Sequence, residues 1–470
     1  MKTLCLSAIA IGLAAISSET LGSQVQPSQP NIVFILADDL GYADVGFNGG
    51  REIATPRLDR LAASGARLEQ FYAQPVCSPT RAALMTGRYP MRHGLQVGVV
   101  RPWAQYGLPL EERTLAQALK QAGYTTAIMG KWHLGHFEPA YLPTRRGFDV
   151  QYGHYNGAID YFTHERDGGH DWHRQDRASY DEGYSTGLLA QEAVKFVDGQ
   201  TSGRPFFLYI TFNAVHAPHQ VPDAYKKPYG DLPEPRRTYA GMLAAMDEGI
   251  GQILEALQRK GLSDNTLVIF SSDNGGPAPG RVTDNGPFRA AKATLYEGGV
   301  RAAACVVWPG RIKAGTIVTE PLHMVDWYPT LLKLAGASLE QPLPIDGRDA
   351  WATIAAGAPS PHAEILINAA PIGGALRAGN WKLLLNGNGH EAEVSLRESG
   401  REVLPGPPKI ELFDLAADPG ERRNLAEAHP EKVKELRERY EALAKQAVPP
   451  KLKPRAPDFK APKVWGEQSW

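Results

Sequence analysis

Long apolar runs dominate the hydrophobic pattern of this chain. Residues 31–37, 206–212 and 266–270 are almost continuously apolar, and polar residues follow each run. Runs of this length predict strands that are buried on both faces of a sheet. Residues 115–122 and 239–260 instead place apolar positions at helical spacing, and a glycine follows each of these segments as a helix stop. The alternation predicts an α/β fold in which helices flank a sheet.

A different pattern begins after prolines that cluster at residues 342–344 and 359–361. Beyond this boundary, short apolar runs predict the strands of a small antiparallel sheet, at residues 364–367, 381–385 and 411–415. The charged and periodic residues 431–446 predict a helix that packs on this sheet. The residues after Pro449 are rich in Pro and Lys, and we expect them to run extended over the surface.

The amino terminus has the pattern of a secretory signal. Lys2 precedes an apolar run from Leu4 to Ile16, and small or polar residues follow up to Ser23. The run is shorter than the ~20 apolar residues that span a bilayer, so we expect cleavage and no membrane span in the mature chain. The chain should therefore divide into a signal peptide (1–23), a catalytic domain (24–345), a C-terminal subdomain (346–448) and an extended tail (449–470).

The charge and the cysteine content limit which classes of partner and which cellular compartment are expected. The chain has 50 Lys and Arg against 51 Asp and Glu, a formal net charge of −1. We therefore expect no nucleic-acid partner, and an anionic substrate requires a local cluster of cations. After cleavage only Cys77 and Cys305 remain, so no disulfide framework is expected, and Cys305 should lie in a buried strand. The chain has no Asn-x-Ser/Thr sequon, which favours a periplasmic or secreted bacterial protein.

The most informative segment for chemistry surrounds Cys77. Pro79 suits the first turn of a helix, where its missing N–H has no partner. Cys77 should then lie at the positive end of that helix, beside free backbone N–H groups and Arg81. An anion binds readily at such a place. The alternative is a buried structural cysteine before a helix.

Polar side chains follow each of the long apolar runs. Asp38 and Asp39 follow the first run, His216 follows the second, and Asp273 and Asn274 follow the third. Open α/β sheets place their ligands where buried strands end. Carboxylate and amide oxygens suit a hard cation such as Ca²⁺ or Mg²⁺ rather than zinc. The alternative is that the acidic residues are ordinary turn or capping residues.

Two segments carry a resemblance to a known family. The pattern Cys-x-Pro-Thr-Arg from Cys77, which closes in Thr86-Gly87-Arg88, resembles the modification signature of the sulfatase family. Residues 123–133 resemble the second signature of that family. The similarity extends from Asn31 to about Leu425 and is closest to the arylsulfatase B type, on the segments 36–41, 130–135, 142–149, 239–242, 412–415, 418–419 and 424–425.

The resemblance implies a fold, a modified residue and a metal. The fold would be an alkaline-phosphatase-like α/β/α sandwich with a large mixed sheet, plus a smaller C-terminal α+β subdomain with an antiparallel sheet. A formylglycine-generating enzyme would oxidise Cys77 to formylglycine (3-oxoalanine), whose hydrated aldehyde attacks sulfur. One Ca²⁺ would be held by Asp38, Asp39, Cys77, Asp273 and Asn274. The catalytic residues would be Cys77, Arg81, Lys131, His133, His216 and Lys292.

The resemblance also implies the reaction, a hydrolysis of sulfuric esters in sulfated oligosaccharides or aryl sulfates. The sulfate would be the 4-O-sulfate of a galactosamine or galactose residue. Residues 153–181 and 387–408 depart from the family and are expected to be loops that set specificity. Candidate sugar contacts are Trp132, Arg145, Arg146, His154 and His164. Two alternatives are a phosphate or phosphonate ester hydrolase of the same superfamily and a non-catalytic protein that binds sulfated glycans.

Overall fold

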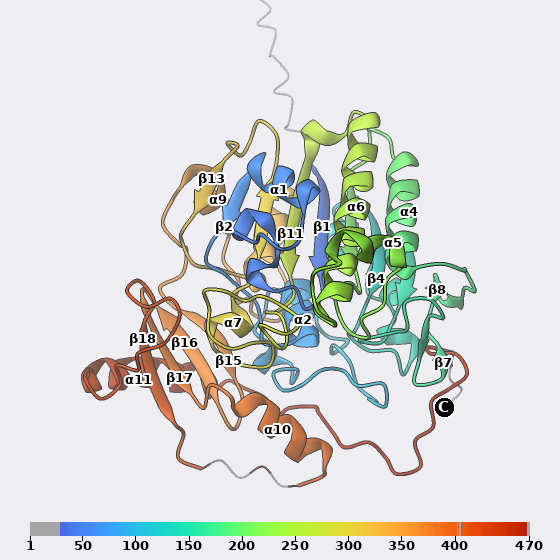
Figure 1. Ribbon diagram of the computed structural model, residues 1–470. Coiled ribbons are helices and arrows are strands. Elements are labelled where there is room, and N and C mark those ends of the chain that lie inside the picture. Colours follow the sequence, from blue (N-terminus) through green and yellow to red (C-terminus); the bar gives the residue numbers. More distant parts are fainter. Residues whose placement is uncertain (1–28, 402, 404–405, 468–470) are drawn as a thin grey trace, which may run out of the picture.

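A sheet of 10 strands forms the centre of the molecule in the computed structural model, which describes residues 29–401, 403 and 406–467 (Figure 1). The strand order is β13-β2-β12-β11-β1-β10-β4-β5-β8-β9. In this order the strands are Thr316–Val318, Ala66–Leu68, Ala304–Val307, Thr266–Ser272, Asn31–Ala37, Phe206–Thr211, Thr125–Lys131, Val150–His154, His173–Arg174 and Arg177–Ala178. The expected signal peptide lies outside the described residues.

The long apolar runs form the middle of this sheet, as predicted. β1 pairs in parallel with β10 and β11, so that Ile35 lies opposite both Ile210 and Phe270. β10 and β5 each pair in parallel with β4. The strands toward the edges include antiparallel pairs, β11 with β12 and β5 with β8. The sheet is therefore mixed, and Cys305 is buried in β12 as expected.

Helices cover both faces of the large sheet, which confirms the expected α/β/α fold. On one face, Val33 and Ile35 of β1 pack in a core with α1 (Pro56–Ala63), α4 (Ser185–Asp198) and α6 (Arg236–Arg259). On the other face, Phe34 and Leu36 pack in a core with the helices α2 (Cys77–Thr86), α3 (Leu115–Gln121), α8 (Trp327–Leu334) and α9 (Trp351–Ala356). This alternation follows from the two-residue period of a strand.

A second, antiparallel sheet lies in the C-terminal part of the chain (Figure 1). Its strands are β15 (Ile365–Ala369), β16 (Gly374–Ala378), β17 (Trp381–Leu385) and β18 (Ile410–Asp414). Helix α11 (Pro430–Ala444) packs Leu436 and Tyr440 against it. The antiparallel sheet and its helix are confirmed, whereas residues 387–408 contain the helix α10 (Gly389–Glu398) where a loop was expected.

Short elements complete the described fold. Two strand pairs, β3 with β14 and β6 with β7, lie outside the two larger sheets, and residues 153–181 hold β6 to β9 where a loop was expected. These strands are Phe71–Tyr72, Leu322–His323, Glu165–Arg166 and Gly169–His170, and the short helices α5 and α7 are Asp223–Lys226 and Glu297–Val300. Short 3₁₀ turns occur at Tyr42–Asp44, Gly46–Asn48, Pro90–Arg92, Pro139–Tyr141, Pro143–Arg145, Lys227–Tyr229, Ser263–Asn265 and Met324–Asp326.

The residues after α11 run past Gly94 to β7 as an extended segment, residues 448–467, which we call the strap. In Figure 1 the strap ends beside β7, although β7 and the strap are far apart in the sequence. The backbone N–H of Lys451 donates to the Gly94 carbonyl at 2.8 Å, and that of Trp465 donates to the His170 carbonyl at 2.9 Å. The Leu452 and Trp465 side chains are buried. Within the described residues, every helix is too short or too polar to cross a bilayer.

Candidate active site

The carboxyl ends of β1, β10 and β11 meet at one edge of the large sheet. Asp38 and Asp39 follow β1, and Asp273 follows β11. The backbone N–H of Asp38 donates to the Ala214 carbonyl after β10, and that of Asp273 donates to the Ala37 carbonyl, both at 3.0 Å. These bonds keep the strand ends together past the last residues of the sheet. The three strands are parallel neighbours, so the polar residues that follow them in the sequence meet at one point.

Helix α2 brings Cys77 to this edge. The helix begins at Cys77 itself, and Val76 before it is extended, with φ −148° and ψ 165°. The Cys77 side chain therefore lies in the first turn, as the Pro79 position predicted. Only 2% of Cys77 is exposed, and burial raises the pKa of its thiol to about 11. An unmodified thiol here is neutral at pH 7 and is a poor nucleophile.

The side chains at the sheet edge fit a cation. Ligand atoms of Asp38, Asp39, Cys77 and His216 all lie within 4.8 Å of one another. Two buried oxygens, Asp38 Oδ1 and Asn274 Oδ1, have no hydrogen-bond partner among the described residues. The Asn274 amide donates to Asp39 Oδ1 at 2.8 Å, which fixes the direction of its own oxygen. Orphaned oxygens cost free energy in a protein interior, and a hard cation satisfies them.

Asp39 is held in a strained position at the centre of this group. Its φ of 63° is left-handed, which a non-glycine residue adopts at a cost of about 1–3 kcal/mol. The Lys292 ammonium pairs with its carboxylate at 2.7 Å, and His216 Nε2 lies 3.5 Å away. Burial raises the pKa of the Asp39 carboxyl, but Lys292 and His216 outweigh it and hold this pKa below its usual range. Asp39 is therefore an anion at neutral pH.

Arg81 and Lys131 lie behind the cavity rather than along its wall, and both side chains are fully buried. The Arg81 guanidinium donates to Asp273 Oδ2 at 3.0 Å and to the Lys131 carbonyl at 2.8 Å. The Lys131 ammonium pairs with Asp38. Burial and the nearby Asp38 raise the pKa of Asp273. The two buried cations thus balance two buried acids and hold them in place.

The two histidines of the site, His133 and His216, face the same cavity. His133 Nε2 lies 3.1 Å from the Val100 carbonyl, which can only accept, so this nitrogen carries the proton. Burial and Lys131 lower the pKa of His133 well below its usual value, and burial and Lys292 lower the pKa of His216 to about 3. Both imidazoles are therefore neutral at pH 7.

A cavity of about 620 Å³ opens above Cys77, and His133, His216 and Lys292 line it. Its outer walls come from the segment 98–102, from Gly157 and Ala158, from Arg166 of β6 and from α10. Helix α10 contributes His390, Glu391, Val394, Ser395 and Glu398. Sequence reasoning missed these wall residues. The departures of residues 153–181 and 387–408 from the family pattern were the signals that pointed to most of them.

The expected sugar contacts do not line this cavity. Trp132 is buried in the core and donates to the Tyr141 carbonyl at 2.9 Å. Arg146 is buried and donates to backbone carbonyls, including that of Glu112 at 2.8 Å. Arg145 is exposed and lies 3.5 Å from Asp176.

The remaining two candidates, His154 and His164, are also buried away from the cavity wall. The rings of both stack on Trp172, with centroids 6.3 Å and 4.5 Å from it. His154 Nδ1 lies 2.9 Å from the Asn156 carbonyl, and burial lowers the pKa of His154 to about 3. These five side chains were chosen by residue type near a motif, and the fold uses all of them except the exposed Arg145 for packing and backbone hydrogen bonds.

The chain is similar to known proteins along most of its length. The Sulfatase family pattern matches residues 30–337. Arylsulfatase J of Mus musculus is 39% identical over 469 residues, covering 92% of this chain and 78% of the relative. N-acetylgalactosamine-6-sulfatase of Mus musculus is 38% identical over 355 residues, covering 70% of this chain and 67% of the relative. The crystal structure of Ps i-CgsB in complex with k-i-k-neocarrahexaose has a TM-score of 0.80 and 32% identity, covering 91% of this chain and 95% of that chain.

These comparisons correct two expectations. The missing glycosylation sequon favoured a bacterial source, but curated relatives that match over most of the chain are mammalian enzymes, so that prediction is wrong. The absence of one short acceptor motif is too weak an observation to identify a source. The similarity also does not single out the arylsulfatase B type, since the relatives include other arylsulfatases and a 6-sulfatase.

Proposed function

The chain belongs to the sulfatase family, and we propose that it removes sulfate from sulfated carbohydrates through a formylglycine formed from Cys77 beside one bound Ca²⁺. That it is a sulfatase follows from the family; the modified residue, the ion and the sugar are the proposal. The observation that carries the proposal is the group of four side chains, Asp38, Asp39, Cys77 and His216, whose ligand atoms lie within 4.8 Å of one another. This group places a possible cation site directly beside the residue that would be modified.

The residues present suit a calcium ion. We assign Asp38, Asp39, Asp273 and Asn274 as ligands, together with the modified residue at position 77. The four are all-oxygen donors of mixed carboxylate and amide type, which Ca²⁺ accepts in flexible geometry. The ion would supply positive charge to the sulfate oxygens and favour the ionised form of the nucleophile. His216 Nε2 is close enough to share the site, so exchange of His216 also tests the ligand set.

The modified residue explains why a buried, neutral thiol stands at this point. When oxidised to formylglycine and hydrated, residue 77 would supply a hydroxyl nucleophile and a second hydroxyl whose collapse to the aldehyde releases sulfate. We propose Asp273 as the proton acceptor beside it. A formylglycine-generating enzyme is therefore a required partner of this chain.

Departure of the sugar requires a proton donor on the cavity wall. Lys292 is the cation that lines the cavity beside Cys77, and 20% of its side chain is exposed. Burial lowers the pKa of Lys292, but Asp39 outweighs it and keeps the ammonium charged. His216 is neutral, and its Nδ1 faces the Ala217 carbonyl at 2.5 Å, so its Nε2 carries no proton to donate. We propose that Lys292 delivers the proton to the leaving oxygen.

We propose a sulfated oligosaccharide as the substrate, with the 4-O-sulfate of galactosamine or galactose as the bond cleaved. The structural relative solved with a carrahexaose supports an oligosaccharide, whereas the relative named as a 6-sulfatase makes 6-O-sulfate the competing position. Both positions are tested in one assay. Sulfate released from 4-O- and 6-O-sulfated disaccharides is measured by ion chromatography, with the corresponding phosphate ester as control.

Mass spectrometry of the Cys77 peptide tests the modification directly. We expect the peptide to lose the mass of a thiol and gain that of an aldehyde only after co-expression with a formylglycine-generating enzyme, and activity should follow the modified fraction. Full activity with an unmodified thiol would disprove the covalent proposal.

Removal of the ion with a chelator, followed by addition of Ca²⁺ or Mg²⁺, identifies which ion restores activity. A free concentration of that ion a hundredfold above its Kd should stabilise the fold by about 2.7 kcal/mol.

A further inference from the structure

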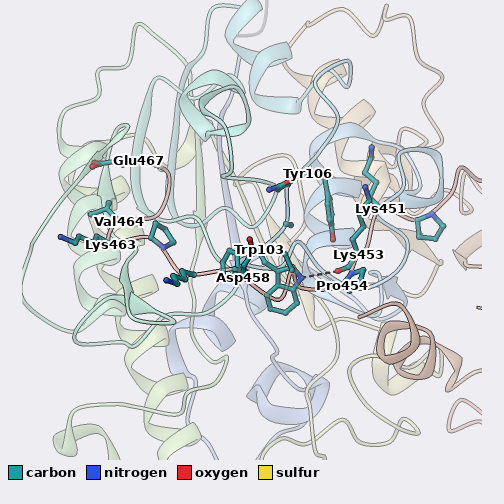
Figure 2. A pocket seen from close by; sticks show the side chains of 16 residues that line it. Trp103, Tyr106, Lys451, Lys453, Pro454, Asp458, Lys463, Val464 and Glu467 are labelled. Carbon is teal, nitrogen blue, oxygen red and sulfur yellow. Dashed lines mark hydrogen bonds between the residues drawn. The ribbon is translucent and has the colours of Figure 1, made fainter. Parts of the chain in front are cut away.

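A second cavity, larger than the one above Cys77, lies between the strap and residues 103–106 (Figure 2). Its volume is about 1050 Å³, compared with about 620 Å³ for the cavity at Cys77. Strap residues from Pro450 to Glu467 form one side, and Trp103 and Tyr106 are the aromatic residues on the other. We call this cavity the lysine groove, because the lysines of the strap line it.

The lysine groove concentrates positive charge that the rest of the chain does not neutralise. Its lysines are Lys451, Lys453, Lys460 and Lys463, and its acidic residues are Asp458 and Glu467. None of the four ammonium groups pairs with a carboxylate in the part of the chain that the structure describes. Glu467 is already engaged, since it accepts a hydrogen bond from the backbone of Ala178 at 3.0 Å. On a chain of formal net charge −1, four unpaired cations in one groove favour an anionic ligand.

Aromatic surface accompanies this charge. Trp103 lies in the middle of the groove in Figure 2, and its indole N–H donates to the Lys453 carbonyl at 3.4 Å. The guanidinium groups of Arg101 and Arg455 lie 5.8 Å and 6.0 Å from its ring centroid. A half-buried indole with cations beside it offers an apolar platform for a sugar ring and charges for the groups that the ring carries.

One segment of the chain contributes to both cavities. Val99, Val100, Arg101 and Pro102 line the Cys77 cavity, and the next residues along the chain, from Trp103, line the groove. The two cavities are therefore neighbours along this segment, and we infer that a glycan chain held in the first can extend past Arg101 to the second.

The strap joins the two cavities at a second point. Arg166 lines the Cys77 cavity, and its carbonyl accepts a hydrogen bond from the Trp465 indole at 2.8 Å. Val464, the residue before Trp465, lines the groove. The Lys463 carbonyl accepts a bond from the His170 N–H at 2.9 Å, so the backbone is anchored while the Lys463 side chain stays exposed. The lysines are thus presented from a fixed backbone.

We propose that the lysine groove binds the anionic glycan chain that extends beyond the sugar whose sulfate is removed. The ligand class is a polyanionic polysaccharide, held by sulfate or carboxylate groups on the strap lysines and by a sugar ring on Trp103. This inference deepens the proposed function and depends on it for the identity of the chain in the first cavity. Binding to the groove itself does not require turnover.

The test replaces the three exposed strap lysines together, Lys453→Gln, Lys460→Gln and Lys463→Gln. The matched control replaces three exposed lysines that line neither cavity, Lys195→Gln, Lys313→Gln and Lys434→Gln. Both proteins are made without the formylglycine-generating enzyme, so that no sulfate is lost during the measurement. Fluorescence anisotropy then follows binding of labelled chondroitin sulfate, hyaluronan and single-stranded DNA of similar length.

We expect the strap variant to bind chondroitin sulfate about tenfold more weakly at low salt, and the control to change less than about twofold. The difference should vanish near 0.5 M salt, because exposed charges are then screened. An equal loss of affinity for hyaluronan identifies carboxylates as the groups that bind the lysines. A loss of affinity for chondroitin sulfate alone identifies sulfates. Unchanged binding, or a tenfold loss that is the same for DNA, would overturn the proposal of a glycan site.

Kinetics of the modified enzyme separate this proposal from the proposed function. The strap variant should keep its kcat/KM for the small substrate 4-nitrocatechol sulfate and show about a tenfold higher KM for sulfated oligosaccharides. An equal loss of kcat/KM on the small substrate would mean that the strap supports the fold of the active site. That result would overturn the proposal that the groove binds the glycan. Absence of sulfate release by the wild type from any ester would overturn the proposed function and leave the binding result standing.

Discussion

The Cys77 site and the lysine groove are both rich in cations, yet they hold them in opposite ways. Arg81 and Lys131 have no exposed surface, and each pairs with an acid of the site. Lys453 and Lys463 of the groove are exposed and, among the described residues, have no carboxylate partner. Buried pairs act at low dielectric and are fixed before a substrate arrives, whereas exposed ammonium groups are mobile and screened by salt. Chemistry and chain binding can therefore be disturbed separately.

The replacement Cys77→Ala should separate the two regions most strongly. We expect kcat to fall by about a thousandfold or more, because the proposed nucleophile is lost. Chondroitin sulfate binding in the groove should stay within about twofold of the wild type, since Cys77 lines only the inner cavity. Ion chromatography of released sulfate and fluorescence anisotropy measure the two effects.

Cys305→Ala is the matched control for this experiment. Cys305 is the other free cysteine of the described chain and is fully buried in β12, away from the sheet edge. Its replacement should cost about 1 kcal/mol of the free energy of unfolding and leave turnover unchanged. If both alanine variants lost turnover equally, the role of Cys77 would be structural.

Lys131→Met should lower both turnover and stability. The change removes the nearer of the two cations that pair with the buried Asp38 and leaves only Arg81, at 3.7 Å, so we expect the free energy of unfolding to fall by about 3 kcal/mol and kcat/KM by about a hundredfold. Lys382→Met is the control, because Lys382 is equally buried and pairs with Glu297 and Glu421, none of which lines the Cys77 cavity. It should lose similar stability in urea unfolding and keep its turnover. A hundredfold loss in both variants would show that activity reports stability alone.

The centre of the fold and the sheet edge that carries the proposed metal site could be predicted from the sequence for one physical reason. Strands buried on both faces are continuous apolar runs, and neighbouring parallel strands end at the same edge. The side chains that follow β1 and β11 therefore had to meet, whatever the rest of the chain does. Asp38 and Asn274 each keep one buried oxygen free of partners at that meeting point.

The outer walls of the two cavities could not be predicted in this way. Helix α10 buries only His390 and Glu393, so it lacks the apolar stripe that marks a helix in a sequence. Trp465 is fully buried, but its indole partner is the carbonyl of Arg166, 299 residues away along the chain. Trp132 and Arg146 do not line the Cys77 cavity, because residue type near a motif does not show which way a side chain points. These features depend on long-range packing.

His390 of α10 offers a test that salt should not affect. Burial lowers the pKa of His390 from 6.5 to about 4. The unfolded chain therefore takes up a proton first on acidification, and stability is lost as the pH falls from 6.5 toward 4. We expect this group to cost the fold about 2 kcal/mol between pH 7.5 and pH 5.

His390→Gln should remove that part of the pH dependence, because glutamine does not titrate and can still accept from the Gly98 N–H, which lies 3.4 Å from His390 Nε2. Urea unfolding at both pH values, at low and at high salt, measures the difference. Since burial causes the shift, the result should be the same at both salt concentrations, unlike binding in the lysine groove. Identical pH slopes for the variant and the wild type would mean that His390 is hydrated.

The smallest expected effect lies where the two cavities join. Arg101 lines the Cys77 cavity, its guanidinium lies 5.8 Å from the Trp103 ring, and it pairs with Glu398 of α10 at 2.5 Å. Glu398→Gln keeps the shape of that side chain and frees the guanidinium for a glycan anion. The pair is partly exposed, with 31% and 26% of the two side chains accessible, so stability should change by less than about 1 kcal/mol.

Freeing Arg101 should lower the KM for sulfated oligosaccharides about threefold at low salt and leave the KM for 4-nitrocatechol sulfate unchanged, because only a longer substrate reaches the boundary. Glu435→Gln is the control, since Glu435 forms a comparable surface pair with Lys432 on α11 and lines neither cavity. A lower KM for both substrates would place Arg101 at the cleaved sulfate itself. The boundary between the buried chemistry and the exposed binding surface would then lie farther from Cys77, at Trp103.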